Sequence, residues 1–267
     1  CVYPENHPLN IIIDEQGVCS GCIVHEEKDQ IDWSKRFDKL LHIIDSYRRT
    51  THDRVADCIV PVSGGRESYF VVDTVKRKLG LRPLLVSYNK QYNTAIGIKN
   101  LAYLKTHFEC DLLSLTVSPK VVKKLTFGTL KTRGSIYWHC IAGQTAFAVQ
   151  TAVRFKVPLI IWGAHQGLDQ VGMFSHLDEV EMTRKYRAEH DLMGLEAEDL
   201  LGNTTLHEND LHPYLYPSDR EIAINGIRGI YLGKFVRWDS KAQHEDMIRK
   251  YGYSTNTQLR TFDTYNN

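Results

Sequence analysis

The sequence predicts an α/β fold built on a doubly wound parallel sheet, and three observations support it. Apolar runs rich in β-branched residues recur between residues 53 and 170, amphipathic segments with helical spacing separate them, and glycines or prolines stand at the boundaries. Strands that alternate with helices of this length are typical of parallel sheets. We expect a cysteine-bearing segment (1–30) and a helical connector (31–52) before this region, and a mainly helical region (171–267) after it.

Four strands are expected in the sheet region, at residues 55–62, 83–88, 110–117 and 158–162. A helix that ends at Gly80 should join the first two strands, a second helix is expected around residues 98–108, and an Ala-rich helix should span roughly 140–156. Parallel sheets of this kind bind ligands outside the carboxyl ends of their strands. The residues that follow each strand are therefore the first candidates for a site.

The region after residue 170 shows no continuous strand run, so we expect helices joined by loops. Ser240 and Gln243 are spaced as a capping box, which predicts the start of a helix that Gly252 ends. We expect no strand of the sheet to come from this region.

The composition is that of an ordinary globular protein, with 42% hydrophobic and 24% charged residues. The chain carries 33 basic and 32 acidic residues, and this balance gives no support for a nucleic-acid partner. No apolar run approaches the ~20 residues needed to span a bilayer, and no secretory signal is visible. A cytoplasmic protein is predicted. Because the first residue is Cys1 rather than Met, the native start is expected to lie upstream.

The segment from Ser63 to Ser68 has the features of a phosphate-binding loop. It follows an apolar strand, contains the paired glycines Gly64 and Gly65, and opens an amphipathic helix. Glycines let the backbone approach a ligand closely, and the N–H groups at a helix start favour phosphate. Glu67 could hold a Mg²⁺ that bridges the phosphates. Neither of the two commoner nucleotide signatures, G-x-x-x-x-G-K-[S/T] and G-x-G-x-x-G, occurs in the chain.

This loop resembles the PP-loop of the ATP pyrophosphatases, and other blocks resemble one family within that superfamily, the N-acetyl sugar amidotransferases. The blocks that carry the resemblance are Cys1–Pro4, Asp14–Cys22, Ile31–Trp33, Trp162-Gly163, Tyr231–Gly233, Trp238-Asp239 and Tyr251-Gly252. The resemblance implies a sheet of the adenine nucleotide alpha-hydrolase type. It also implies an enzyme that uses ATP and Mg²⁺ to convert an acetamido group into an acetamidine, in lipopolysaccharide or flagellin-sugar pathways.

The resemblance and the strand ends together give a set of candidate site residues. The nucleotide is expected at Ser63, Gly64, Gly65, Arg66, Glu67, Ser68, Val86, Ser87, Tyr88 and Gly163. The catalytic residues are expected to be Ser63, Arg66, Glu67 and His165. Substrate contacts are expected from His165 and Gln166, which lie nearest to the end of the fourth strand, and phosphate contacts could come from Lys131 or Arg133.

Two positions depart from the pattern of the family. Glu67 stands where Asp is usual, so its carboxylate reaches one methylene further. Ala164 stands where Glu is usual, and His165 or Asp169 could replace that carboxylate.

The N-terminal cysteines predict a zinc site. Cys19 and Cys22 have the spacing of a metal knuckle, and Cys1 could be a third ligand. A segment so short has few apolar residues for a core of its own, which favours a structural metal. The resemblance implies that the fourth ligand lies upstream of Cys1, and His7 or His25 is the alternative.

No glutaminase fits within about 50 residues ahead of the sheet region, so ammonia is expected to come from a partner glutaminase. The expected substrate is an N-acetylated sugar, nucleotide-linked or acidic. Two other functions are compatible with such a loop. One is a tRNA-modifying enzyme of the thiolase kind, which would need a cysteine pair near the nucleotide and a basic face. The other is a non-catalytic nucleotide-binding module.

Overall fold

A five-stranded parallel sheet lies at the centre of the computed structural model, which describes residues 3–4, 6, 11–48, 54–169, 172–201 and 206–255. The strand order is β3–β2–β1–β4–β5, and every pairing is parallel. The strands are β1 (Cys58–Pro61), β2 (Pro83–Tyr88), β3 (Leu112–Leu115), β4 (Leu159–Trp162) and β5 (Arg228–Tyr231). The order reverses between β1 and β4, and in sheets of this kind ligands bind at the carboxyl ends of the strands near such a reversal.

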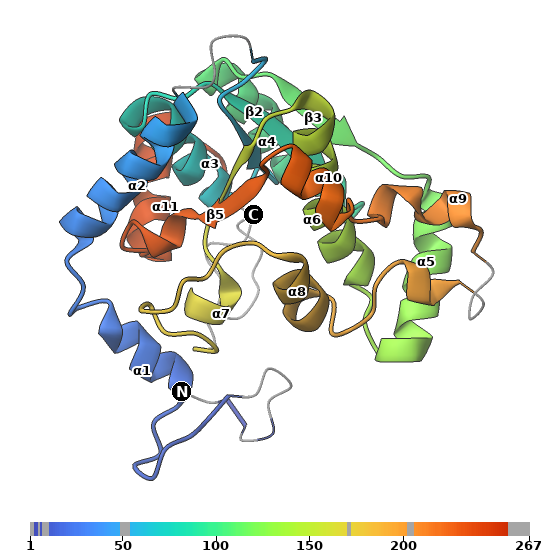
Figure 1. Ribbon diagram of the computed structural model, residues 1–267, viewed down its shortest axis with the longest axis horizontal. Coiled ribbons are helices and arrows are strands. Elements are labelled where there is room, and N and C mark those ends of the chain that lie inside the picture. Colours follow the sequence, from blue (N-terminus) through green and yellow to red (C-terminus); the bar gives the residue numbers. More distant parts are fainter. Residues whose placement is uncertain are drawn as a thin grey trace.

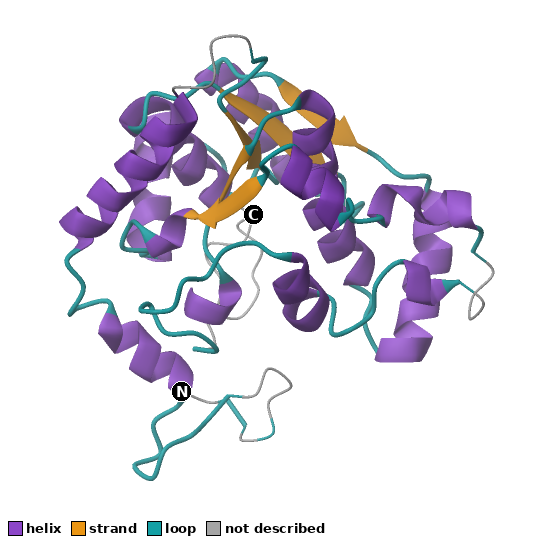
Figure 2. Cartoon of the chain, in the orientation of Figure 1, coloured by secondary structure: helices purple, strands orange, loops and turns teal. Residues whose placement is uncertain are grey.

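Helices cover both faces of the sheet (Figures 1 and 2). They are α1 (Ser20–Glu27), α2 (Trp33–Arg48), α3 (Arg66–Asp73), α4 (Ala95–Phe108), α5 (Pro119–Arg133), α6 (Trp138–Phe155), α7 (Gln166–Asp169), α8 (Arg184–Tyr186), α9 (Glu208–Leu211), α10 (Asp219–Ile224) and α11 (Ser240–Tyr251). A π-helical turn over Thr74–Lys78 extends α3.

The two faces of the sheet have separate apolar cores. On one face, α2, α3, α4 and α11 bury side chains such as Leu40, Val71 and Met247 against β1 and β4. On the other, the small residues Ala148 and Ala152 of α6 let that helix lie close to the strands. Strands covered on both faces must be apolar throughout, and β2 and β4 are buried along their whole length.

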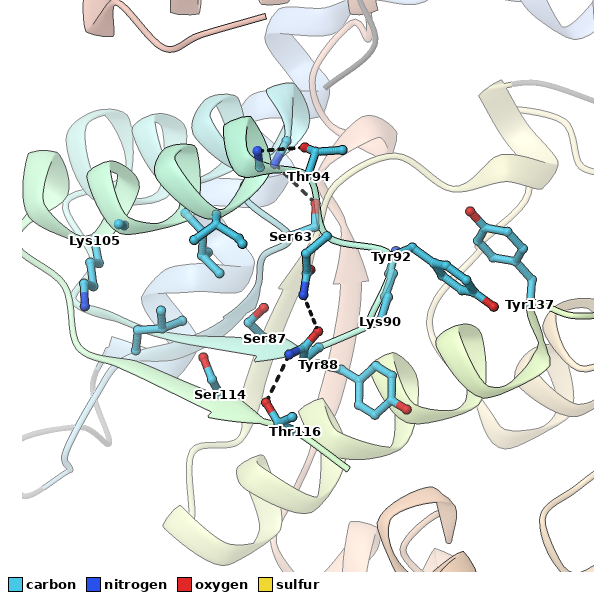
Figure 3. A pocket seen from close by; sticks show the side chains of 18 residues that line it. Ser63, Ser87, Tyr88, Lys90, Tyr92, Thr94, Lys105, Ser114, Thr116 and Tyr137 are labelled. Carbon is cyan, nitrogen blue, oxygen red and sulfur yellow. Dashed lines mark hydrogen bonds between the residues drawn. The ribbon is translucent and has the colours of Figure 1, made fainter. Parts of the chain in front are cut away.

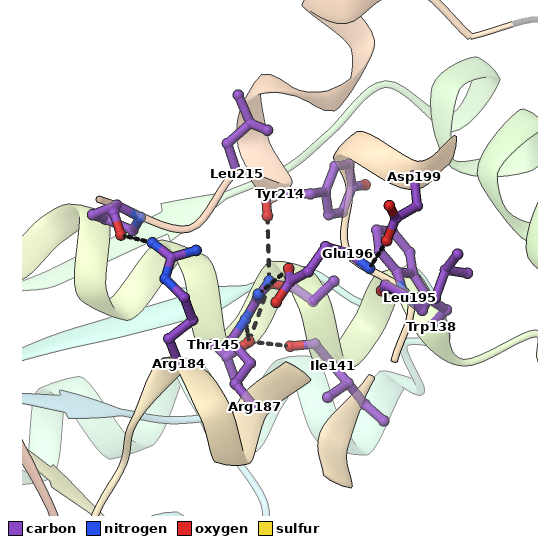
Figure 4. A network of polar contacts seen from close by, with 12 residues as sticks. Trp138, Ile141, Thr145, Arg184, Arg187, Leu195, Glu196, Asp199, Tyr214 and Leu215 are labelled. Carbon is purple, nitrogen blue, oxygen red and sulfur yellow. Dashed lines mark hydrogen bonds and ion pairs between the residues drawn. The ribbon is translucent and has the colours of Figure 1, made fainter. Parts of the chain in front are cut away.

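The buried side chain of Arg187, directly after α8, binds this part of the chain to α6 (Figure 4). The Arg187 guanidinium donates to the Thr145 hydroxyl at 2.8 Å and to the Tyr214 carbonyl at 3.3 Å, and it pairs with Glu196. The Trp138 indole N–H, on the same helix as Thr145, donates to the Leu195 carbonyl at 2.8 Å. A buried guanidinium needs such a complete set of acceptors, so this segment is held firmly over the amino-terminal half of α6.

The sheet region agrees with the sequence prediction, but the expectation of no strand after residue 170 is wrong. Residues 228–231 form β5, which pairs with β4 so that Ile230 lies beside Ile161. Gly229 is required within β5, because a Cβ there would lie 2.8 Å from the Cβ of Met182. The domain boundaries predicted at residues 30, 52 and 170 remain a prediction. One strand of the sheet, β5, lies after the boundary at residue 170.

The N-cap of α11 lies one residue before Ser240, the residue that the capping-box pattern predicts as the cap. This N-cap is Asp239, whose carboxylate accepts the N–H groups of Lys241 and Ala242, so Ser240 is the first helical residue and not the cap. Gly252 ends the helix at φ +62°, as expected. Among the described residues, no helix has both the length and the apolar character needed to cross a membrane.

Candidate active site

The predicted phosphate loop follows β1 and lies at the carboxyl edge of the sheet. The Ser63 N–H donates to the Ser68 hydroxyl at 2.9 Å, and the Gly65 N–H donates to the Ser63 hydroxyl at 3.4 Å. Gly64 has φ +82°, and a Cβ at this position would lie 2.8 Å from the Cβ of Leu101 on α4. The two serines and the glycine therefore fix a tight turn, in which Gly64 is buried against α4 and Ser63 is exposed.

The start of α3 is suited to an anion. Its N-cap is Gly65, and within the described part of the chain no side chain caps it. The first-turn N–H groups of a helix carry partial positive charge, which attracts phosphate. Pyrophosphate or a nucleotide phosphate fits this position.

A cavity of about 500 Å³ opens directly beside the loop (Figure 3). Ser63 and Gly65 form one end, and α4 forms an apolar wall with Ile98 and Leu101. The rest of its lining is largely polar and comes from the ends of β2 and β3 and the segments after them: Ser87, Tyr88, Asn89, Lys90, Ser114 and Thr116. A cavity with an apolar wall, hydroxyl groups and a phosphate-binding end suits a nucleoside triphosphate.

One cation beside the loop, Lys90, was not predicted from the sequence. Lys90 lines the cavity, and its charge lowers the pKa of Glu67, as does that of Arg66. Lys131 and Arg133 lie in the last turn of α5 and not on the cavity, and the Lys131 ammonium lies 4.4 Å from the centre of the Phe127 ring. The signal for Lys90 was its position two residues after the second strand.

Tyr88 is held at the cavity by a buried polar network. Its hydroxyl lies 2.8 Å from the Tyr214 hydroxyl and 3.2 Å from Nδ1 of His139. Burial lowers the pKa of His139 to about 4, so the imidazole is neutral. Gly143 faces the Tyr88 ring and leaves no room for a side chain. Of the three residues predicted on β2, Ser87 and Tyr88 line the cavity, whereas Val86 packs in the core beside α6.

Glu67 follows β1 and Asp169 follows β4, the two strands between which the strand order reverses. Burial raises the pKa of Glu67, and the charge of Asp169 at the end of α7 raises it further. Asp169 binds the Lys28 ammonium through Oδ1 at 2.7 Å, while its buried Oδ2 has no hydrogen-bond partner among the described residues. Mg²⁺ prefers one or two carboxylates together with phosphate oxygens, so this pair fits the ion that the resemblance implies.

The residues predicted for the substrate lie at the end of β4. His165 is buried against Tyr231, with ring centroids 4.6 Å apart, and its Nδ1 accepts the Gly167 N–H. Burial lowers its pKa to about 4, and the charge of His190 adds to this. Gln166 is exposed at the start of α7. The Gly163 carbonyl accepts the Gly233 N–H, and none of these residues lines the cavity beside the loop.

The described residues give no support for the predicted zinc site. Cys19 and Cys22 lie together at the start of α1, where they pack with Ile11 and Met173. Cys1 and His7 lie outside the described residues. Among the residues that the structure does describe, no group of three or more His, Cys, Asp or Glu side chains is placed to hold a metal ion. Zinc at Cys1, Cys19 and Cys22 therefore has no support here and enters none of the chemistry below.

No family model matches the chain. In sequence it is 23% identical, over 117 residues, to an uncharacterized protein of Methanocaldococcus jannaschii. The aligned residues make up 43% of this chain and 40% of that protein. The chain thus matches less than half the length of this relative.

Two solved structures align with most of the chain, at low identity and low TM-score. The NH3-dependent NAD synthetase of Campylobacter jejuni, in complex with the nitrate ion, has a TM-score of 0.39 and 12% identity over 85% of this chain and 99% of that chain. The NMN synthetase of Francisella tularensis has a TM-score of 0.36 and 12% identity over 86% and 100%. At these values the activity has to be inferred from the site itself.

Proposed function

We propose that this chain is an ATP-dependent enzyme that converts the acetamido group of an N-acetylated sugar into an acetamidino group, as the resemblance implies for surface polysaccharide or flagellin glycans. The observation that carries the proposal is the Ser63–Ser68 loop at the carboxyl end of β1, with its uncapped helix start and the cavity of about 500 Å³ beside it. A nucleotide whose phosphates lie on the loop would extend its nucleoside along this cavity.

The chemistry begins with a poor electrophile, because nitrogen donation quenches the acetamide carbonyl. In the first step the carbonyl oxygen attacks the α-phosphorus of ATP, and the bond to pyrophosphate breaks. In the second step ammonia adds to the imidate carbon and AMP leaves with the original oxygen, while one proton passes to solvent. Both steps are helped mainly by positioning the reactants and by stabilising negative charge.

The chain supplies groups for both tasks. The N–H groups of the loop and the hydroxyl of Ser63 would bind the departing pyrophosphate, and Lys90 and Arg66 would offset its charge. Mg²⁺ bound between Glu67 and Asp169 would neutralise charge on the phosphates. Ser87 and Asn89 would border the adenosine, because they line the cavity beyond the loop.

The sugar is placed at the end of β4 in this proposal. His165 and Gln166 lie there, in the segment 164–187 that is rich in hydrogen-bonding groups. Because its pKa is about 4, His165 is neutral at physiological pH and can accept or donate a hydrogen bond. Its predicted role is to orient the acetamido group.

Pyrophosphate release tests the function. The protein is incubated with ATP, Mg²⁺, ammonium and a panel of N-acetylated sugars, free and nucleotide-linked, and AMP and amidine are followed by mass spectrometry. We expect AMP and pyrophosphate in equal amounts with at least one sugar. Tight ATP binding without turnover on any sugar would favour the non-catalytic module, and turnover only with tRNA would favour the modifying enzyme.

Ammonia delivery is tested separately. Ammonium has no lone pair for attack, so the isolated chain should work only with high ammonium at raised pH, where neutral ammonia is more abundant. Adding a partner glutaminase should make the reaction depend on glutamine at neutral pH, since NH₃ would reach a water-excluded site directly. Efficient amidation by this chain alone with glutamine and no ammonium would contradict the need for a partner.

A further inference from the structure

Lys28, at the end of α1, reaches from the amino-terminal helices to the carboxyl end of β4. Its ammonium lies 2.7 Å from Oδ1 of Asp169 and 3.5 Å from the Trp238 carbonyl oxygen. The two side chains of the ion pair are only 4% and 7% exposed. Removing two charges from water costs several kcal/mol per ion, so a buried pair is weak evidence of a stabilising device. This cost suggests that the pair has another role.

The geometry at Asp169 points to that role. Lys28 occupies one carboxylate oxygen, and the other, Oδ2, is buried without a hydrogen-bond partner among the described residues. A Cβ added at Gly233 would lie only 3.2 Å from Oδ2, so the glycine allows this oxygen to pack directly against the backbone that follows β5. Helix α3, which carries Glu67 in its first turn, packs at the same strand end: a Cβ at Gly163 would lie 3.3 Å from the Val71 side chain, and the Phe70 ring lies 5.3 Å from that of Trp238. Oδ2 is thus a charged acceptor held in a fixed direction next to the phosphate loop.

The amino-terminal helices also hold the chain that follows α7. Glu27 Oε2 accepts the Ser175 hydroxyl at 2.9 Å and the His176 N–H at 2.8 Å. Arg36 on α2 donates to the His176 carbonyl at 2.7 Å. Helices α1 and α7 lie side by side (Figure 1). Residues between 27 and 36 therefore contact this segment at two places, at Asp169 and at residues 175–176.

We propose that Lys28 is a positioning residue of the nucleotide site, which fixes the Asp169 carboxylate so that it can hold a divalent cation together with Glu67. The amino-terminal helices then complete the site and are not a separate attachment. The inference rests on the proposed function for the identity of that cation, the Mg²⁺ that accompanies ATP.

Lys28→Met, Lys28→Arg and the control Lys39→Met test the role. Lys39 lies in the same interface, 2.7 Å from Glu179, but that pair is exposed, with side chains 47% and 67% accessible. Binding of Mn²⁺ alone is measured by electron paramagnetic resonance, and ATP affinity is measured by calorimetry over a range of Mg²⁺ concentrations. Changing the group that orients a metal ligand typically weakens metal binding by about 10- to 100-fold.

We expect Lys28→Met to weaken Mn²⁺ binding and raise the Mg²⁺ requirement by about tenfold, Lys28→Arg to recover most of this loss, and Lys39→Met to match the wild type. Loss of a nearby positive charge would by itself tighten cation binding, so weaker binding can come only from lost positioning. Mn²⁺ affinity equal to or above that of the wild type in Lys28→Met would overturn the inference.

A second variant keeps the test decisive if Lys28→Met does not fold. Asp169→Asn preserves the volume and should weaken Mn²⁺ binding to a similar degree, and unchanged binding would again overturn the role. If the wild type binds Mn²⁺ but not ATP, with both Lys28→Met and Asp169→Asn weaker, the proposed function fails while the positioning role of Lys28 stands.

Discussion

Both the backbone conformation and the packing at Gly64 require glycine, and a control variant at Gly134 separates the two contributions. Its φ of +82° is strained for any other residue, and a Cβ would also overlap Leu101 of α4. Gly134 has a similar φ of +67° with nothing within 4 Å of an added Cβ. We expect Gly134→Ala to lower the free energy of unfolding by about 1 kcal/mol, and Gly64→Ala by roughly 2–4 kcal/mol, in urea titrations. An equal loss of unfolding free energy in the two variants would show that α4 moves to accommodate the added methyl group at little cost.

The Ser68 hydroxyl accepts the Ser63 N–H and so shapes the loop. In the proposed function it also binds phosphate, so its loss should weaken ATP binding. A hydrogen bond to a charged group contributes roughly 1.5–3 kcal/mol, so Ser68→Ala and Ser63→Ala should each weaken ATP binding by about 10- to 100-fold. Calorimetry with each variant and with Ser46→Ala, an exposed serine on α2, measures this. Wild-type affinity in both loop variants would make the loop purely structural.

Single elements show which parts of the fold the sequence could predict. β2 matches its prediction because five apolar or hydroxyl-bearing residues follow Pro83 without a break, a pattern that favours a buried strand. β5 was missed because it has four residues, begins with Arg228, and includes Gly229, a residue that weakens strands. Its backbone pairs with β4, far away in sequence, and the Gly229 carbonyl also accepts the Met182 N–H. Local sequence patterns predict strands that are apolar throughout. They do not predict a short strand such as β5, which forms because a distant strand pairs with it.

Helix α11 allows a test of its cap. Asp239→Ala removes the acceptor for two first-turn N–H groups and should cost about 1 kcal/mol, which is roughly 2–4 °C in Tm for a chain of this size. Asp246→Ala removes a carboxylate and its Lys250 ion pair from the same helix, and should cost about 0.5 kcal/mol or less. Calorimetry of both variants distinguishes the cap from a general effect of lost charge.

For the whole molecule, acid should be destabilising. Burial lowers the pKa of His139 and of His165 to about 4, below the ordinary 6.5. Between these values the unfolded chain binds two protons that the native state does not, so the free energy of unfolding falls as the pH falls. Asp191 acts in the opposite direction, because burial raises its pKa to about 6 and the native state holds its proton longer than the unfolded chain does. Glu67, whose pKa burial also raises, acts as Asp191 does. Burial lowers the pKa values of His176 and His244 too, and these imidazoles add to the loss, so the net effect of acid is destabilising.

Urea titrations between about pH 7 and about pH 4 check this sign. His139→Gln should make the pH dependence shallower, since one of these imidazoles is removed. His42→Gln, at an exposed position on α2, should leave it unchanged. A stability that rises on acidification would show that Asp191 and Glu67 outweigh the imidazoles.

The site as a whole could be predicted only where its parts are local in sequence. The loop, the start of α3 and the end of β2 follow from patterns within a few residues. The contact between Lys28 and Asp169 joins residues 141 positions apart, and nothing in either local sequence points to the other. Such a contact depends on how helices dock once the sheet has formed.

The strand order has a consequence for synthesis. β1 pairs with β2 soon after it, but its other neighbour, β4, is translated about a hundred residues later, with Ile59 facing Ile160. Until β4 leaves the ribosome, one edge of the apolar strand β1 has no partner, and an open edge invites pairing with other chains. We expect nascent chains arrested after α5 to associate with trigger-factor-like chaperones, and chains released after β5 to dissociate from them.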